Sequence, residues 1–350
     1  MNIFVTGGTG LLGRNLIEIL LRRNNQVTAL VRSMKKGQEI WGGGVSLVEG
    51  DMIRVKDFAD ALTGHDALIH TAAYFTEFHR NGNMNEDGRL RRINVEGTVS
   101  LLEAAYYRGV KNAVYVSSSG VLAINRNTPA DEKSFYAAPA DNAYFQSKID
   151  AERAVYRMLE SLPDFRVVFI LPAAMMGPCD AAPTHLGRFV LNYLDQHIPL
   201  ILPGGMPIVD ARDTAAAIVS ALGKGNRGQR FVVGGRTHTM ATIFSTLERA
   251  SGVPAPTRKP SPALLKSLAR VMETMSGITG KPPVLRLEEI RWLKKMPTYN
   301  SSAAENLLGI DFRPLEETIN DTVRWFLAEG MVYPRIPNEM KRRYTRFHLT

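Results

Sequence analysis

The stretch NIFVTGGTGLLGRNLIEILLRR, Asn2–Arg23, runs from an apolar segment through a glycine-rich turn into an amphipathic segment. The apolar segment predicts a strand and the amphipathic one a helix, with Gly7, Gly10 and Gly13 at and just after the turn. Glycines in this order make a tight turn, let the backbone approach a pyrophosphate and allow close helix–sheet packing, while the helix N-terminus stabilises the anion. A purely structural turn is the alternative, but the context predicts a dinucleotide-binding loop.

Beyond this stretch, apolar runs alternate with helix-period segments through the first two-thirds of the chain. Near-continuous Val/Ile/Leu strands between amphipathic helices are typical of a parallel sheet covered on both faces. The sequence therefore predicts an α/β, doubly wound Rossmann fold, whose ligands bind beyond the carboxyl ends of the strands. Strands are expected at 2–7, 27–31, 66–73, 112–118, 166–172 and 230–235, and helices at 11–23, at 91–109, around Tyr144 and at 213–225.

Glycine- and proline-rich segments interrupt this pattern after residue 172, before helix and strand patterns return. We therefore expect a main domain and a smaller lobe. The dinucleotide-binding domain is predicted at 1–173 and 208–235, a mostly helical substrate lobe at 174–207 and 236–330, and a basic tail at 331–350.

The composition, with 45% hydrophobic and 22% charged residues, is that of a soluble globular protein. No basic region precedes the first apolar stretch, and the longest apolar run, Val167–Met176, is too short and proline-broken to span a bilayer. A single cysteine, Cys179, excludes an intrachain disulfide. Together these features predict a cytoplasmic protein.

The formal net charge of +9 arises mostly in the C-terminal part, where residues 335–346 carry five cations against one acid. We interpret this segment as a solvated tail, with peripheral contact to an anionic membrane as the alternative. No helix-turn-helix or zinc-finger spacing supports a nucleic-acid partner. The seven histidines form no H-E-x-x-H or paired-cysteine pattern, so no metal site is expected.

The segment YFQSK places Tyr144 four residues before Lys148, so on a helix the two side chains share one face. An ordinary surface helix can show the same spacing. In an active site, however, a nearby ammonium favours the phenolate and lowers the phenol pKa toward the range of general acid–base catalysis. Ser117–Ser119 end the preceding predicted strand, and one of these serines is expected to hydrogen-bond the substrate oxygen.

Arg32 follows the second predicted strand, and no acidic residue occurs until Glu39. At this position an acid accepts a hydrogen bond from the 2′-hydroxyl of NAD, whereas an arginine pairs with the 2′-phosphate of NADP. The sequence therefore favours NADP(H) over NAD(H), with a solvated loop cation as the alternative. Arg14, at the start of the first helix, is a second candidate for this contact.

These motifs resemble the extended short-chain dehydrogenase/reductases of the NAD-dependent epimerase/dehydratase superfamily. The resemblance covers nearly the whole chain, and the dihydroflavonol 4-reductase-like branch is the most similar. The motifs that carry it are TGxxGxxG, Tyr144-x-x-x-Lys148, the serine run, EGD at Asp51, HTAA at Ala72 and Ala73, NVEGT at Asn94, LPAAMMGP near Pro172 and VDARD ending at Asp213.

The resemblance implies that Ser119, Tyr144 and Lys148 are catalytic, with Ser118 as the alternative serine and Ser117 in a structural role. It also implies that Lys148 contacts the nicotinamide ribose, that Asp51 meets the adenine and that Asn94 supports the active-site helix. The implied cofactor-binding residues are Thr6, Gly7, Gly10, Leu11, Leu12, Gly13, Arg32, Asp51, Met52, Thr71, Ala72, Ala73, Asn94, Ser117, Tyr144, Lys148 and Pro172.

The implied reaction is hydride transfer between nicotinamide and a ketone, an aldehyde or a secondary alcohol. Nucleotide-sugar epimerases and dehydratases share this catalytic face, but they usually carry Arg-Pro and an asparagine where this chain has Leu171, Ala173 and Ala174. Four apolar side chains indicate an apolar substrate pocket instead: Phe75, Phe78, Met175 and Met176. The alternative is that they belong to the hydrophobic core.

A non-enzymatic dinucleotide sensor or scaffold is the alternative from a different class. The retained Tyr144 and Lys148 argue against it. We therefore expect an NADP(H)-dependent oxidoreductase that acts on a small carbonyl or alcohol substrate as a monomer or a homodimer.

Overall fold

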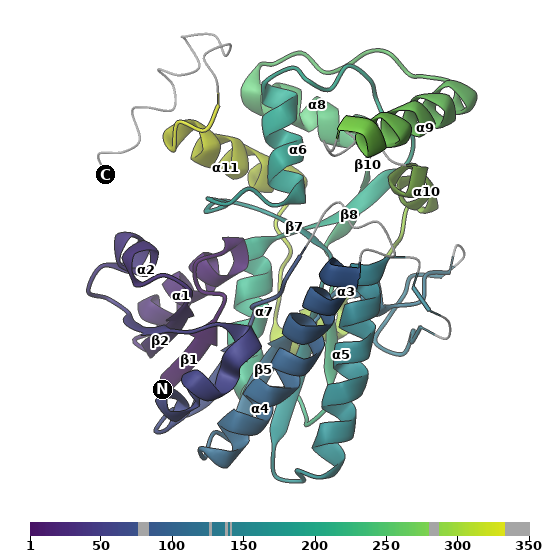
Figure 1. Cartoon of the computed structure of the whole chain (residues 1–350). Coiled ribbons are helices and arrows are strands. Elements are labelled where there is room, and N and C mark those ends of the chain that lie inside the picture. Colours follow the sequence, from purple (N-terminus) through teal and green to yellow (C-terminus); the bar gives the residue numbers. More distant parts are fainter. Residues whose placement is uncertain (76–83, 126–127, 137–138, 141, 280–286, 333–350) are drawn as a thin grey trace.

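The computed structural model describes residues 1–75, 84–125, 128–136, 139–140, 142–279 and 287–332. Its main sheet has seven strands in the order β3-β2-β1-β4-β5-β6-β9, and every neighbouring pair is parallel (Figure 1). The predicted doubly wound fold is thus confirmed. The strands are β1 (Asn2–Thr6), β2 (Gln26–Val31), β3 (Ser46–Glu49), β4 (Ala67–His70), β5 (Asn112–Val116), β6 (Arg166–Pro172) and β9 (Arg230–Val233).

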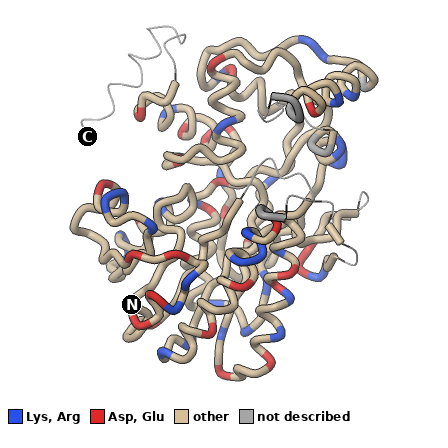
Figure 2. The backbone as a smooth tube through the Cα atoms, in the orientation of Figure 1, with Lys and Arg blue, Asp and Glu red and all other residues tan. Residues whose placement is uncertain are grey.

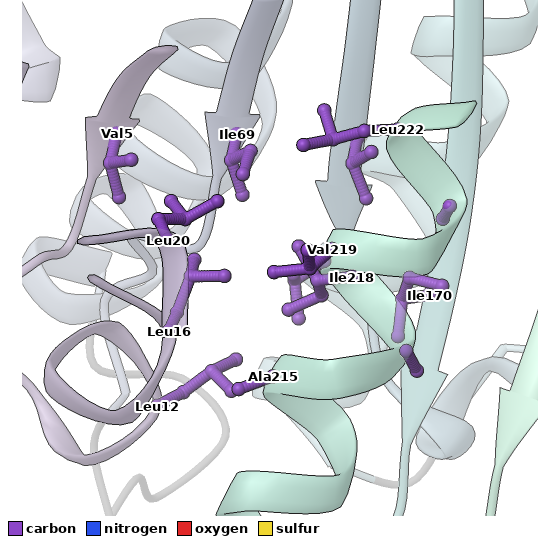
Figure 3. Close-up of a cluster of buried hydrophobic side chains, with 14 of the residues drawn as sticks. Val5, Leu12, Leu16, Leu20, Ile69, Ile170, Ala215, Ile218, Val219 and Leu222 are labelled. Atoms are coloured by element: carbon purple, nitrogen blue, oxygen red, sulfur yellow. The ribbon is translucent and has the colours of Figure 1, made fainter. Parts of the chain in front are cut away.

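Helices cover both faces of this sheet because successive strand residues point to opposite sides. Ile3 and Val5 of β1 pack into one core and Phe4 into the other. The first core is closed by the amphipathic helices α1 (Leu11–Arg22) and α7 (Ala211–Gly223), whose apolar side chains meet in Figure 3. The second core is closed by α4 (Thr98–Tyr107) and α5 (Ala143–Glu160). The remaining elements on the main domain are α2 (Met34–Trp41), α3 (Met84–Leu90), the short 3-10 helices η1 (Met52–Asp57), η2 (Ala59–Leu62) and η4 (Ser119–Val121), and the π-helical η3 (Arg91–Gly97).

A smaller lobe lies beyond the carboxyl ends of the main strands (Figure 1). It holds a three-stranded sheet in the order β10-β8-β7 and its own apolar core. Its strands are β7 (Ala174–Met176), β8 (Gly205–Asp210) and β10 (Arg236–Thr239), and its helices are α6 (His185–Leu194), α8 (Met240–Ser251), α9 (Pro262–Thr279), α10 (Leu287–Lys295) and α11 (Leu315–Ala328).

The boundaries between the two parts differ from the predicted ones in two places. Strand β8 pairs with β7 and β10, so the chain re-enters the main domain at α7 rather than at residue 208. Residues 304–310, predicted in the lobe, pack into the core under α1 and α7 through Ala304, Leu308 and Ile310. They include the π-helical turn η5 (Ala304–Leu308). Local periodicity does not reveal pairing partners, which explains both differences.

Lysine, arginine, aspartate and glutamate are interspersed over the described part of the main domain (Figure 2). Within the described ranges, no helix is long and apolar enough to cross a membrane, and no cluster of His, Cys, Asp and Glu is suited to a metal ion. Residues 333–350, most of the predicted basic tail, lie outside the described residues.

Candidate active site

The glycine-rich turn lies at the point where the strand order reverses, between the ends of β1 and β4. Gly7 has φ 77°, and a Cβ there would come within 2.8 Å of the Ala72 backbone nitrogen, so only glycine fits this turn. At Gly13 a Cβ would collide with the Gly7 carbonyl and the Gly8 Cα. Gly10 is the N-cap residue of α1, and no side chain caps this helix N-terminus. The arrangement therefore leaves an open helix N-terminus at the sheet edge, which suits a pyrophosphate.

Gly10 and Gly13 are expected to respond differently to substitution by alanine. A Cβ at Gly10 would have only the Gly7 carbonyl nearby, at 3.6 Å, so Gly10→Ala should fold normally but bind dinucleotide more weakly. Gly13→Ala must displace backbone and should lower the free energy of unfolding by about 3 kcal/mol, the upper end for overpacking. Urea unfolding and fluorescence titration with NADPH separate the two effects. Equal stability losses in both variants would contradict this account of the turn.

Thr6 and His70 tie the ends of β1 and β4 together beneath this turn. The Thr6 hydroxyl lies 2.7 Å from His70 Nδ1, and His70 Nε2 lies 2.9 Å from the Thr98 hydroxyl. Burial, with a smaller effect of the Lys148 cation, lowers the pKa of His70 to about 3, so the imidazole stays neutral. Thr6 also accepts a hydrogen bond from the Ala72 amide, at 3.3 Å. Thr6 is fully buried and serves to position the loop.

The other predicted cofactor-binding residues occupy the same edge of the sheet. Arg32 is exposed directly after β2, beside the N-terminus of α2. Asp51 is partly exposed after β3 and accepts a hydrogen bond from the Ile53 amide at 3.0 Å. Leu11, Leu12, Met52 and Pro172 are buried, Thr71 and Ala72 are partly exposed, and Ala73 is exposed.

Tyr144 lies in the first turn of α5, which begins after Asn142. The Asn142 side chain accepts hydrogen bonds from the amides of Tyr144 and Phe145, at 2.9 and 3.2 Å, and so caps the helix. The Tyr144 ring packs edge-on against Phe75, with centroids 4.8 Å apart. Burial raises the pKa of Tyr144 above its usual value. The phenol is therefore protonated and ready to donate.

Lys148 lies one turn further along α5 and is only 2% exposed. Its ammonium donates to the Val116 carbonyl at 3.2 Å and lies 5.4 Å from the centroid of the Tyr115 ring. Burial lowers the pKa of Lys148 to about 8, and Glu152 partly offsets that effect. The spacing predicts that this cation lowers the Tyr144 pKa. In the protein alone burial outweighs such an effect, because the ammonium is directed toward the strand.

Asn94 joins the loop after β4 to α5, the helix that carries Tyr144 and Lys148. It lies in the π-helical η3, a distortion often found at functional sites. Its amide nitrogen donates to the Tyr74 carbonyl at 2.9 Å and to the Ser147 hydroxyl at 3.0 Å, and its oxygen accepts from the Tyr74 amide at 2.7 Å. Ser147 in turn donates to the Tyr144 carbonyl at 2.7 Å. Asn94 thus bonds directly to the turn of α5 that carries Tyr144 and Lys148.

The three serines after β5 have different surroundings. Ser117 is buried near Glu152, whose pKa is raised by burial. Ser118 accepts a hydrogen bond from the Gly120 amide at 3.1 Å and caps η4. Ser119 is 6% exposed and shares a hydrogen bond with Tyr299. The three serines therefore have distinct surroundings, and Ser119 lies beside Tyr299, a phenol other than that of Tyr144.

Tyr299 is a site residue that the sequence analysis missed. It follows α10, bridges to Ala130 and packs its Cβ against Gly234, where a side chain on the glycine would collide with it. Burial raises the pKa of Tyr299, and the bond to Ser119 counteracts this. No local pattern predicts a contact between residues so far apart in the chain.

The residues expected to form an apolar pocket are not equivalent. Phe75 is 50% exposed beside Tyr144, whereas Met176 is 2% exposed in the lobe core. Met175 is partly buried against the core under α1 and α7. Phe78 lies outside the described residues. Of the three that the structure describes, Phe75 is the one that packs against the Tyr144 ring.

The fold and this site define a Rossmann protein with a glycine-rich turn suited to a dinucleotide and with Tyr144 and Lys148 one turn apart on α5. The sequence matches the NAD dependent epimerase/dehydratase family over residues 3–234. The chain belongs to this family, within the extended short-chain dehydrogenase/reductases, as its motifs suggested. The family binds nicotinamide dinucleotides, and its enzymes are oxidoreductases and epimerases.

Two curated proteins are similar over almost the whole chain. "Sterol demethylase protein B" of Methylococcus capsulatus is 31% identical, over 95% of this chain and 100% of its own length. "Putative dihydroflavonol 4-reductase" of Synechocystis is 29% identical, over 94% and 95%. Among solved structures, that of gox2253 has a TM-score of 0.78 at 27% identity and covers 94% of this chain and 99% of its own.

Proposed function

We propose that the protein is an NADP(H)-dependent oxidoreductase that interconverts a carbonyl compound and its alcohol. The observation that carries this proposal is the protonated Tyr144 phenol at the start of α5, with Lys148 behind it and the ring of Phe75 beside it. A proton donor beside an apolar surface suits the reduction of a carbonyl group.

The residues present fit the cofactor. The uncapped N-terminus of α1 suits the pyrophosphate, Asp51 and Ala72 border the adenosine side, and Arg32 is exposed at the end of β2 without an ion-pair partner in the described part of the chain. The bound nicotinamide supplies or accepts the hydride. Lys148 is the residue that would bind the ribose of the nicotinamide.

The chain's own groups handle the oxygen of the substrate. Tyr144 donates its phenol proton to that oxygen in the reducing direction and removes it in the oxidising direction. Ser119 orients the oxygen, because its hydroxyl is held at the start of η4 by Tyr299. Asn94 fixes the turn of α5 through Ser147, so that the phenol and the ammonium keep their relative positions.

The substrate class that fits best is an apolar ketone or hydroxylated ring compound. Phe75 offers an apolar face beside the phenol, and one relative carries a sterol-related name. Leu171, where sugar-nucleotide enzymes carry arginine, is fully buried in β6 and offers no polar contact. These features weigh against the nucleotide-sugar alternative.

A substrate screen tests the proposal. Purified protein is mixed with NADPH and a panel of aldehydes, cyclic ketones, sterol ketones and nucleotide sugars, and oxidation of NADPH is followed by absorbance. We expect net oxidation with at least one apolar carbonyl compound. Turnover of a nucleotide sugar without net change in NADPH would instead support an epimerase.

Tyr299→Phe is expected to lower kcat/KM about fivefold, the effect of about 1 kcal/mol for one hydrogen bond. The phenyl ring keeps the packing against Gly234 but no longer holds the Ser119 hydroxyl. Steady-state kinetics in the wild-type and Ser119→Ala backgrounds measure this effect. In the Ser119→Ala background, Tyr299→Phe should have no further effect, and an equal loss in both would assign Tyr299 a role independent of Ser119.

A further inference from the structure

A buried charged cluster lies behind the catalytic face. It consists of Lys148 and Glu152 on α5 and Arg230 at the start of β9. The three residues are 2%, 4% and 5% exposed, respectively. Lysine, glutamate and arginine are almost never this deeply buried unless they are paired, so the cluster requires an explanation.

We propose that Glu152, held by Arg230, is a positioning residue that keeps the Lys148 ammonium charged and in place behind the cofactor site. The catalytic consequence rests on the proposed function. The structural consequence, a Lys148 that stays protonated because of Glu152, does not.

The geometry of the cluster supports this role. Glu152 Oε2 lies 3.3 Å from Arg230 Nη2. Glu152 Oε1 is buried and has no hydrogen-bond partner among the described residues. Lys148 precedes Glu152 by four residues on the same helix, so the two side chains share a face. The carboxylate therefore pairs directly with Arg230 and acts on the Lys148 ammonium through its charge, at a separation longer than an ion-pair contact.

Arg230 is itself anchored away from the site. Its Nη1 donates to the Glu132 backbone carbonyl at 2.7 Å, and its guanidinium lies 4.3 Å from the centroid of the Phe135 ring. The Glu132 carboxylate is engaged elsewhere, because it accepts from the Val232 amide at 2.8 Å. Glu152 is thus the carboxylate available to both cations, and Arg230 limits how far it can move.

The surrounding titratable groups are neutral near pH 7. Burial, with a smaller effect of Lys148, lowers the pKa of His70 on β4 to about 3. Burial, with a smaller effect of Glu152, raises the pKa of Tyr115 on β5 and raises that of Tyr156 on α5 to about 12. Burial alone raises the pKa of Tyr144, which is therefore protonated. Lys148 therefore depends for its countercharge on Glu152, whose own pKa is raised by burial, an effect that Arg230 and Lys148 oppose.

Removal of the carboxylate would leave two uncompensated cations in a dry environment, which is strongly unfavourable. Arginine cannot release its proton, so Lys148 would do so. Burial already lowers the pKa of Lys148 to about 8, and Glu152 opposes this. Glu152→Gln should therefore lower the Lys148 pKa by about one unit or more. Arg230→Met removes one buried like charge and leaves Lys148 as the cation that holds Glu152 ionised, so it should raise the Lys148 pKa.

The test that needs no turnover is the pH dependence of stability. The Lys148 pKa changes from 10.5 in the unfolded chain to about 8 in the folded one. Between these values the unfolded state binds more protons, so the free energy of unfolding rises with pH. Below the folded-state pKa both states are protonated and the burial penalty is constant. In Glu152→Gln the rise should begin at lower pH, and in Arg230→Met at higher pH.

Urea unfolding of the full chain from about pH 6 to about pH 10 measures these shifts. Lys148→Met in each background isolates the contribution of Lys148, and Glu160→Gln on the exposed face of α5 is the matched charge control. Shifts in opposite directions that vanish with Lys148→Met are the expected result. The proposal would be overturned if the Lys148-dependent rise in the free energy of unfolding began at the same pH in all backgrounds. If Glu152→Gln does not fold, the upward shift in Arg230→Met decides.

Activity provides the second readout. With NADPH and a substrate from the screen, Glu152→Gln should lose about tenfold in kcat at pH 8 and recover as the pH falls below the new Lys148 pKa. A purely structural defect would lower kcat equally at every pH. If the pH dependence of stability shifts as expected but no NADPH is turned over, the role of Glu152 is supported and the proposed function is rejected. Failure of the proposal and failure of the proposed function are therefore distinguishable.

Discussion

We expect Tyr144→Phe to lower kcat by about a hundredfold or more, the range for loss of a general acid–base group, while the affinity for NADPH stays close to that of the wild type. The structure explains why the two effects separate. The phenol is protonated and lies at the first turn of α5 beside Phe75, away from the glycine turn that suits the pyrophosphate. Phenylalanine keeps the ring packing and removes only the proton donor.

The measurement is steady-state kinetics with a substrate from the screen, together with fluorescence titration of NADPH. Tyr107→Phe is the matched control, because Tyr107 is 71% exposed on α4 and far from the chemistry. It should behave as wild type. A Tyr144→Phe variant with wild-type kcat would show that another group supplies the proton.

Arg32→Asp is expected to reverse the cofactor preference. In the wild type, a charge-assisted contact of about 1.5 to 3 kcal/mol with the 2′-phosphate should favour NADPH over NADH by about ten- to a hundredfold. Arg32 is exposed directly after β2, and the first turn of α2 contains no acid that would repel the phosphate. An aspartate here repels that phosphate and accepts from the 2′-hydroxyl of NADH.

Titration of both cofactors into wild type, Arg32→Asp and Arg23→Asp tests this expectation. Arg23 is an exposed cation at the other end of α1, so its replacement changes the net charge equally without touching the end of β2. The ratio of affinities should change in Arg32→Asp alone. Equal affinities in the wild type, or equal changes in both variants, would remove Arg32 from the site.

The features that could be predicted from the sequence are local ones. Strand β1, the glycine turn and α1 follow from residues adjacent in the chain, and the predicted helix at 11–23 matches Leu11–Arg22 closely. The Tyr/Lys spacing likewise predicts that both residues lie on one helix, and α5 carries them. Such signals come from periodicity and from glycine, both of which act over a few residues.

The features that could not be predicted depend on contacts between distant segments. Tyr299 reaches Ser119 from the chain after α10, and β8 joins the small sheet through pairing with β7 and β10. The pKa of Tyr144 depends on burial, which spacing does not reveal. Glu152 likewise resembles a solvent-facing residue of an amphipathic helix until β9 brings Arg230 against it.

The central claim is that the protein transfers a hydride between the cofactor and a carbonyl carbon. The most direct measurement uses NADPH deuterated at the reactive carbon of the nicotinamide, with mass spectrometry of the product of a carbonyl substrate. We predict an alcohol that carries one deuterium on the former carbonyl carbon for each NADPH oxidised. A product without deuterium, or conversion of substrate without oxidation of NADPH, would contradict the account.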